Sequence, residues 1–231
     1  MSAEQQVTAA MAALDEAFAP LADPERARTM AAYLRDQFAF LGIAAGPRRQ
    51  AQKAALAELV ALGRPSAEVL EGFARSCWER PEREFQYAGC DAVRRWIGRC
   101  DASFLVVLAD LIVTKPWWDT VDSLAVAVGA LAERHPELEA ELDRWNGLTD
   151  LWMVRVSIIA QLGRRERTDA GRLYARCAAQ AGHRDFFVRK AIGWALRDYA
   201  RTDPAGVRSF VAAHPELSGL SVREALKHLG R

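Results

Sequence analysis

A short motif recurs at a fixed interval in the second half of the chain, and this periodicity restricts the fold more than any other feature. Residues 154–158 (VRVSI) recur at 188–192 (VRKAI) and at 222–226 (VREAL), both times after 34 residues. A related beginning, VDSL at 121–124, lies 33 residues before the first of them. A period near this length, with two helices per unit, is typical of an α-solenoid, in which each unit buries its apolar face on its neighbours.

The rest of the sequence also favours helices. Apolar residues recur at helical spacing, and strand signals are nearly absent. Breaks such as Gly46-Pro47, Lys115-Pro116 and Asp203-Pro204 leave segments of roughly 12 to 20 residues, the length of ordinary helices. We therefore predict an all-α fold, an α-solenoid that forms a single domain over residues 1–231 and curves around a concave groove.

Composition narrows the class of protein. Hydrophobic residues make up 51% of the chain, which indicates a folded globular protein. The N-terminal residues lack the basic start and apolar run of a secretion signal, and no segment has the uninterrupted apolar length of a membrane span. We expect a cytoplasmic protein with no membrane partner, and a monomer because no dimer seam is visible.

Four cysteines and four histidines are present, and neither set forms a ligand motif. The cysteines form no CxxC pair, and the histidines form no HExxH motif and are scattered near expected helix ends. We interpret them as buried, reduced thiols and as structural or exposed imidazoles. No glycine-rich loop follows a strand, so we expect no metal and no cofactor.

Charge is divided unevenly along the chain, although the formal net charge is only +1. Residues 119–150 hold eight acids against two arginines, whereas residues 152–201 hold eleven Lys and Arg against four acids. Such asymmetry is typical of a surface that binds a polyanion on one side. It is equally consistent with solvated helix faces whose charges cancel in space, so the counts leave both interpretations open.

The helix expected over residues 188–201 carries a tryptophan away from its apolar side. Its core stripe consists of Val188, Ile192, Ala195, Leu196 and Tyr199. Its far side carries Lys190, Trp194, Arg197 and Arg201. A tryptophan at helical spacing is usually a core or interface residue, but Trp194 lies opposite the core among three cations. An exposed aromatic flanked by cations suits contact with a base or sugar, with phosphates bound nearby.

The segment TKPWWDTVDSL at 114–124 places two tryptophans and two aspartates at the start of another helix. Asp119 lies in the first turn after Pro116, where a carboxylate interacts favourably with the helix dipole. We assign Asp119 that structural role. Asp122 shares a face with Trp118 and lies further along, where the dipole effect fades, so it requires another explanation.

A third helix, over residues 151–162, carries Arg155 on its apolar stripe. An arginine in that position must meet an anion, because an unpaired buried charge is very costly. Two partners are open for Arg155, a protein carboxylate and a DNA phosphate.

These segments resemble one known family, the AlkD-type DNA alkylation repair glycosylases, which are bacterial proteins with HEAT-like repeats. The similarity is close to full length, and it is most specific in the WWDTVD block and the KAIGWALR block, which occur in that order. Further matching segments are MAAYLRDQFAFLGI, ERPEREFQYAGCDAV, LWMVRVSIIAQL, FFVRKAIGWALRDYARTDP and SVREALKHL.

The resemblance implies an enzyme of base excision repair that removes N3- and N7-alkylated purines from double-stranded DNA without a metal or cofactor. It implies that Asp122 is the catalytic carboxylate and that Trp118 and Trp194 are cleft aromatics. It implies a phosphate contact for Arg155 and further contacts from Tyr33, Arg49 and Arg197, beside which the helix pattern places Lys190 and Arg201. A bacterial protein of this family would act at the nucleoid.

This activity explains a carboxylate beside tryptophans on a basic surface. An N3- or N7-alkylpurine carries a fixed positive charge, and positive charge moves onto the deoxyribose as the glycosidic bond breaks. A nearby carboxylate stabilises that charge and can orient or deprotonate the attacking water. The base departs neutral, so no general acid is needed.

Two other classes compete with this interpretation. A non-catalytic HEAT-like module that binds distorted or branched DNA would keep the basic face and tolerate loss of Asp122 or the tryptophans. A protein-interaction solenoid, a common use of helical repeats, would lack the excess of positive charge at 152–201.

Overall fold

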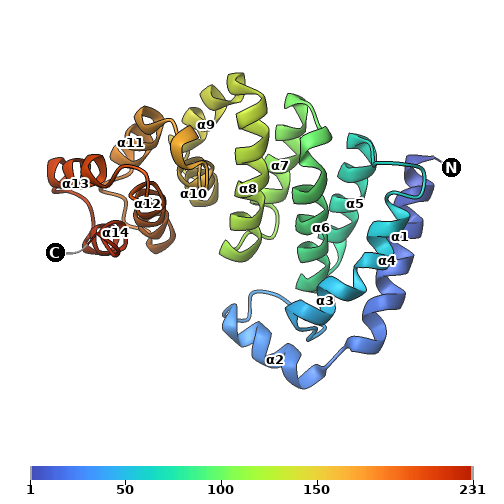
Figure 1. Cartoon of the computed structure of the whole chain (residues 1–231). Coiled ribbons are helices and arrows are strands. Elements are labelled where there is room, and N and C mark those ends of the chain that lie inside the picture. The colour runs from blue at the N-terminus through green and yellow to red at the C-terminus, as the bar shows by residue number, and fades with distance from the viewer. Residues whose placement is uncertain (1, 230–231) are drawn as a thin grey trace. The chain divides into compact units, whose positions relative to one another are not determined.

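The computed structural model describes residues 2–229, and in this part of the chain the all-α prediction is confirmed (Figure 1). Extended pairing among the described residues is confined to one isolated bridge between Ala39 and Glu82. The chain divides into two compact units, Met1–Val107 and Leu108–Arg231. Helix α7 (Leu105–Val113) contains the boundary.

The first unit is built from α-helices joined by short 3₁₀ turns. The α-helices are α1 (Ala3–Phe18), α2 (Pro24–Tyr33), α3 (Ala45–Ala51), α4 (Lys53–Glu58), α5 (Ala67–Glu79) and α6 (Arg83–Trp96). Helix α1 packs against α4 and α5, and α5 packs against α6. The loop before α3 is held by the buried carboxylate of Glu84, which accepts hydrogen bonds from the backbone N–H groups of Leu41, Gly42 and Ile43 at 2.8–3.0 Å.

The second unit consists of alternating helices that follow the sequence repeat. They are α8 (Trp118–Arg134), α9 (Glu139–Asn146), α10 (Leu151–Ile159), α11 (Ala170–Ala179), α12 (Phe186–Tyr199), α13 (Pro204–Ala213) and α14 (Gly219–Ala225). The recurring motif lies on α8, α10, α12 and α14, and these four pack successively, α8 on α10, α10 on α12, and α12 on α14. The predicted repeat is therefore confirmed as a solenoid-like stack within this unit.

Stacking brings residues about one period apart in sequence into contact. Gln180 donates to the carbonyl oxygen of Asn146, 34 positions earlier, at 2.6 Å. Lys190 and Glu224 are also 34 positions apart, and their side chains form an ion pair at 2.6 Å. The repeat therefore gives a rule for side-chain contacts as well as for helix order.

Acidic side chains begin several helices of the second unit. Asp150 caps α10, Asp169 caps α11, Asp185 caps α12 and Asp203 caps α13, each by accepting hydrogen bonds from backbone N–H groups of the first turn. Such a cap satisfies donors that have no partner inside the helix. Two of the four acids in the basic segment 152–201, Asp169 and Asp185, are thus explained by helix geometry.

Many charges that are separated along the chain cancel in space. Arg164, Arg167, Arg172 and Arg176 form ion pairs with acids of the segment 119–150, namely Glu133, Glu139 and Asp143. Of the two interpretations of the uneven charge, cancellation between helices holds for these four arginines. The sequence counts therefore overstate the free positive charge of the second unit.

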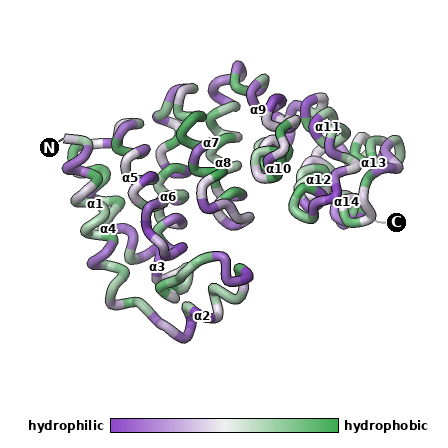
Figure 2. The backbone as a smooth tube through the Cα atoms, turned by 180° about the vertical axis from the view of Figure 1, so that it is seen from behind, coloured by the Kyte–Doolittle hydropathy of each residue, from purple (hydrophilic) through white to green (hydrophobic). Residues whose placement is uncertain are grey.

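Hydropathy follows the helices in the expected way, with apolar and polar residues alternating along them (Figure 2). In the second unit the predicted core residues Val121, Leu124, Val128 and Leu131 of α8 are fully buried. Among residues 2–229, no helix combines the length and the apolar character that crossing a membrane would take.

Candidate functional site

One pocket of the second unit collects most of the residues that the sequence singled out. It has a volume of about 250 Å³ and is lined from α8, α10 and α12. The lining residues are Trp118, Asp122, Arg155, Phe186, Phe187, Lys190, Trp194 and Arg197. The structure thus brings together the three predicted catalytic residues and three of the predicted DNA contacts.

Helix α8 places Trp118 and Asp122 one turn apart on the same side. The close approach of α10 to this side depends on Gly129, because a Cβ atom there would lie 1.9 Å from the carbonyl oxygen of Ala160. Ala125, on the same face, is also buried. Small residues at these two positions therefore let α10 come close enough for Arg155 to reach Asp122.

The side chains of Asp122 and Arg155 form a bidentate ion pair. Arg155 Nε donates to Asp122 Oδ1 at 2.7 Å, and Arg155 Nη2 donates to Asp122 Oδ2 at 2.8 Å. Arg155 Nη1 donates to the carbonyl oxygen of Phe187 at 2.6 Å. The Arg155 side chain is 4% exposed and that of Asp122 is 17% exposed.

This pairing decides between the two partners left open for Arg155. The structure shows a protein carboxylate, and the carboxylate is the proposed catalytic residue itself. The interpretation of Arg155 as a phosphate contact is corrected accordingly, because its buried charge is already neutralised by a residue 33 positions earlier on the neighbouring repeat.

Two opposing effects act on the acidity of Asp122. Burial raises the pKa of this carboxyl above its ordinary value of 3.8, and the hydrogen bonds and charge of Arg155 lower it. The nearby charge of Asp119 adds a smaller upward contribution. The net direction is upward, so Asp122 accepts a proton at a higher pH than an exposed aspartate does.

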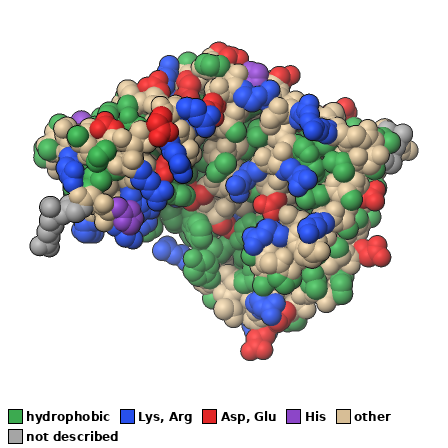
Figure 3. All heavy atoms as spheres, in the orientation of Figure 1, with side chains coloured by type: hydrophobic (Ala, Val, Ile, Leu, Met, Phe, Trp, Pro, Cys, Tyr) green, Lys and Arg blue, Asp and Glu red, His purple; other side chains and the backbone are tan. Residues whose placement is uncertain are grey.

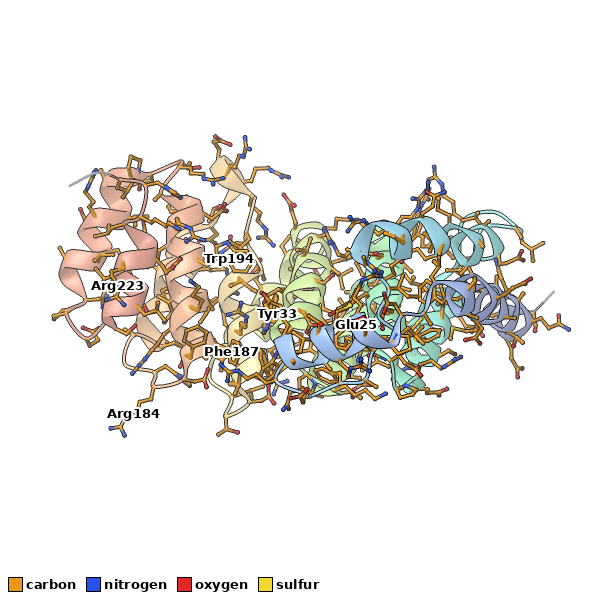
Figure 4. All side chains as sticks on the ribbon, turned by 90° about the horizontal axis from the view of Figure 1, so that it is seen from below. Glu25, Tyr33, Arg184, Phe187, Trp194 and Arg223 are labelled. Atoms are coloured by element: carbon orange, nitrogen blue, oxygen red, sulfur yellow. The ribbon has the colours of Figure 1, made fainter. Side chains whose placement is uncertain are left out.

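Helix α12 has the two sides that its sequence predicts. Val188, Ile192 and Leu196 are fully buried, whereas Trp194 is partly exposed and faces the pocket. Phe187 and Trp194 lie seven positions apart and therefore on one side of the helix (Figure 4). The guanidinium carbon of Arg155 is 6.0 Å from the centre of the Trp194 ring.

The two cations beside Trp194 are not free, contrary to the picture of an open basic face. Lys190 Nζ donates to Glu224 Oε1 at 2.6 Å, and Arg197 Nη1 donates to Glu224 Oε2. Lys and Arg side chains still gather over α12 and α14 (Figure 3). The hydrogen bond and the charge of Lys190 are the main causes that lower the pKa of Glu224, so it is ionised at neutral pH.

Sequence reasoning missed the aromatic wall formed by Phe186 and Phe187. The Phe187 ring packs against Trp152 at 4.9 Å and against Trp117 at 5.2 Å between ring centroids. Phe186 contacts Phe187 edge-on at 5.4 Å and is 53% exposed. The signal was present, because Phe187, Lys190, Trp194 and Arg197 follow one another at intervals of three, four and three residues.

The remaining predicted contacts lie outside this pocket. Arg201 is exposed just beyond the end of α12. Tyr33, at the end of α2, and Arg49, on α3, belong to the first unit and are exposed there. Asp119 occupies the first turn of α8, as expected for a carboxylate near a helix N-terminus.

The cysteines match their prediction as buried thiols. All four are buried and none forms a disulfide. Burial raises the pKa of Cys177 to about 12, so this thiol stays protonated. Within residues 2–229, no group of His, Cys, Asp and Glu side chains is arranged to hold a metal ion.

Comparison with known proteins identifies the family. The family model described as "DNA alkylation repair enzyme" matches residues 14–229. Among solved structures, the chain is similar to a "Predicted DNA alkylation repair enzyme from Enterococcus faecalis", with 30% sequence identity and a TM-score of 0.84 over 91% of this chain and 97% of that chain. No protein with a curated description matches. With a family match over nearly its whole length, the chain belongs to the DNA alkylation repair enzymes.

Proposed function

We propose that the protein is a DNA glycosylase that hydrolyses the N-glycosidic bond of cationic N3- and N7-alkylpurines in duplex DNA. One observation carries the proposal. The carboxylate of Asp122 is held by Arg155 in a pocket whose walls include Trp118 and Trp194. Membership of a DNA alkylation repair family supports alkylated DNA as the substrate.

The chemistry requires an anion beside a sugar that becomes positively charged. In this mechanism Trp118 and Trp194 contact the deoxyribose, and Asp122 lies near its anomeric carbon. The carboxylate stabilises the developing cation and orients or deprotonates the water that attacks it. Electrostatic stabilisation of this kind contributes on the order of 3 kcal/mol.

Arg155 acts as the positioning residue for Asp122. A carboxylate has about four sites that accept hydrogen bonds, and Arg155 uses two of them. The other sites remain available to a water molecule or a sugar. The bidentate geometry also restricts rotation of the carboxylate, which a single contact would not do.

The size of the pocket supports contact with a sugar rather than enclosure of an extruded base. Its volume of about 250 Å³ is below the range of pockets that enclose whole drug-sized ligands. The positive charge of the alkylated base makes it a good leaving group, and it departs neutral. In the proposed mechanism Lys190, Arg197 and Arg201 contact phosphates, and Tyr33 and Arg49 add contacts from the first unit.

The direct test is release of 7-methylguanine from a duplex that contains it, measured by mass spectrometry with the purified protein. Asp122→Asn should slow release by at least about 10²-fold and leave DNA binding intact or tighter, because a negative charge is removed. Asp119→Asn is the matched control, since it removes the same charge one turn earlier on α8, and it should retain near-normal release.

Normal turnover by the Asp122→Asn variant would refute the assignment of the catalytic carboxylate. A wild-type protein that binds the duplex without releasing base would favour the competing function, a non-catalytic module for distorted or branched DNA.

A further inference from the structure

We propose that Glu224 is a positioning residue of the pocket, which ties Lys190 and Arg197 to α14 and removes one positive charge from the wall around Trp194. The proposal extends the proposed function, because that function brings a cation into the pocket. Its effect on DNA binding can be measured whether or not the protein releases a base.

The geometry is that of a bridge across Trp194. Lys190 precedes Trp194 by about one turn of α12, and Arg197 follows it by about one turn. Glu224 accepts from Lys190 with one carboxylate oxygen and from Arg197 with the other. Its side chain is 16% exposed, so the bridge is partly shielded from water.

The backbone of α12 is adapted to this bridge. A Cβ atom at Gly193 would lie 2.5 Å from Glu224 Cβ and 2.9 Å from the carbonyl oxygen of Ser221. Any other residue at 193 would therefore push α14 away. Ser221 Oγ donates to the carbonyl oxygen of Arg189 at 2.9 Å, which fixes α14 against α12 at the same point.

The charges explain why a carboxylate is useful here. Asp122 and Arg155 neutralise each other, so Lys190 and Arg197 without Glu224 would leave two positive charges beside the pocket. With Glu224 one remains. A cationic nucleoside meets less repulsion in such a pocket, while the remaining positive charge still attracts DNA.

The position of Glu224 within the repeat shows that the sequence specifies this contact. Glu224 is the repeat equivalent of Lys190, and neighbouring repeats bring equivalent positions together, as they do for Gln180 and Asn146. Opposite charges at equivalent positions therefore pair across α12 and α14. The bridge to Arg197, on the next turn of α12, adds the second cation.

The experiment compares Glu224→Gln with the wild type in two measurements. The first is the dependence of affinity for undamaged duplex on salt concentration, and the second is the single-turnover rate of 7-methylguanine release. Gln keeps the shape of Glu but releases one cation. The slope of log affinity against log salt should steepen by about 0.9, one phosphate contact. The rate of release should fall about fivefold, because a second positive charge opposes the cation.

Two further variants make the test specific. Glu133→Gln removes the same charge from the pair with Arg167, outside the pocket lining, and should change neither measurement. Glu224→Gln combined with Lys190→Gln restores the charge of the wall and should return the salt slope to the wild-type value.

An unchanged salt slope in Glu224→Gln would overturn the proposal. So would weaker binding that accompanies a lower unfolding temperature, which is what a purely structural residue would give. If the wild type releases no base, the proposed function fails, and the slopes of Glu224→Gln and the double variant still decide the role of Glu224.

Discussion

Two buried arginines of the second unit, Arg176 and Arg155, solve the same physical problem with different results. Each is 3% exposed, and a buried guanidinium requires anions and hydrogen-bond acceptors. Arg176 meets the carboxylates of Glu139 and Asp143 at 2.7–2.8 Å and the carbonyl oxygens of Glu139 and Ser157 at 3.1–3.2 Å. These contacts join α9, α10 and α11.

Arg155 has a smaller set of partners, and one of them borders an open pocket. Its contacts are Asp122 and the carbonyl oxygen of Phe187. The comparison teaches that a buried ion pair can either hold helices together or hold one carboxylate in a fixed orientation. Which of the two it does depends on whether the anion retains access to a ligand.

The largest effect on stability should come from breaking the Arg176 network. Arg176→Met leaves Glu139 buried without its closest cation and should lower the free energy of unfolding by about 3 kcal/mol, measured by urea denaturation. Arg172→Met removes a more exposed cation that shares Asp143 and should cost less than about 1 kcal/mol. Equal losses in the two variants would contradict the distinction between buried and exposed pairs.

A smaller effect on stability, but a clear one on activity, is expected at Arg155. Arg155→Lys keeps the charge and loses the bidentate geometry, so Asp122 is no longer held in one orientation. Single-turnover release of 7-methylguanine should fall about 30-fold, with a loss of unfolding free energy well below that of Arg176→Met. Unchanged release would show that the orientation of Asp122 does not depend on Arg155.

The smallest effect is a shift in pH dependence. Catalysis requires ionised Asp122, and burial raises its pKa, so release should decline on acidification at a higher pH than for an exposed aspartate. Arg155→Met removes the group that lowers this pKa, so the acidic limb should move further toward neutral pH. The rate of release measured between about pH 4 and pH 8 tests this, with spontaneous depurination subtracted. An acidic limb that moves to lower pH in Arg155→Met would contradict it.

Much of the fold of the second unit was predictable from periodicity. The 34-residue motif located α10, α12 and α14, and the spacing of apolar residues placed Val188, Ile192 and Leu196 in the core. These predictions succeed because a helix that packs against neighbours must repeat its apolar side every three to four residues. Trp194 was separated from the core by the same rule.

The candidate site was predictable in part. Spacing along single helices placed Trp118 beside Asp122, and Trp194 between Lys190 and Arg197. It did not reveal that Arg155 meets Asp122, or that Glu224 bridges the two cations. The excess of positive charge at 152–201 was overestimated, because counts along the chain do not include acids that arrive from neighbouring repeats.

By itself, the sequence determined the helices, their order, their apolar sides and the residue types available for chemistry. These properties follow from interactions between residues close together in the chain. Only the tertiary structure decided the pairing of charges, because Coulomb interactions depend on distances in space and Asp122 meets Arg155 across 33 residues. That pairing converts an isolated aspartate into an oriented carboxylate beside two tryptophans.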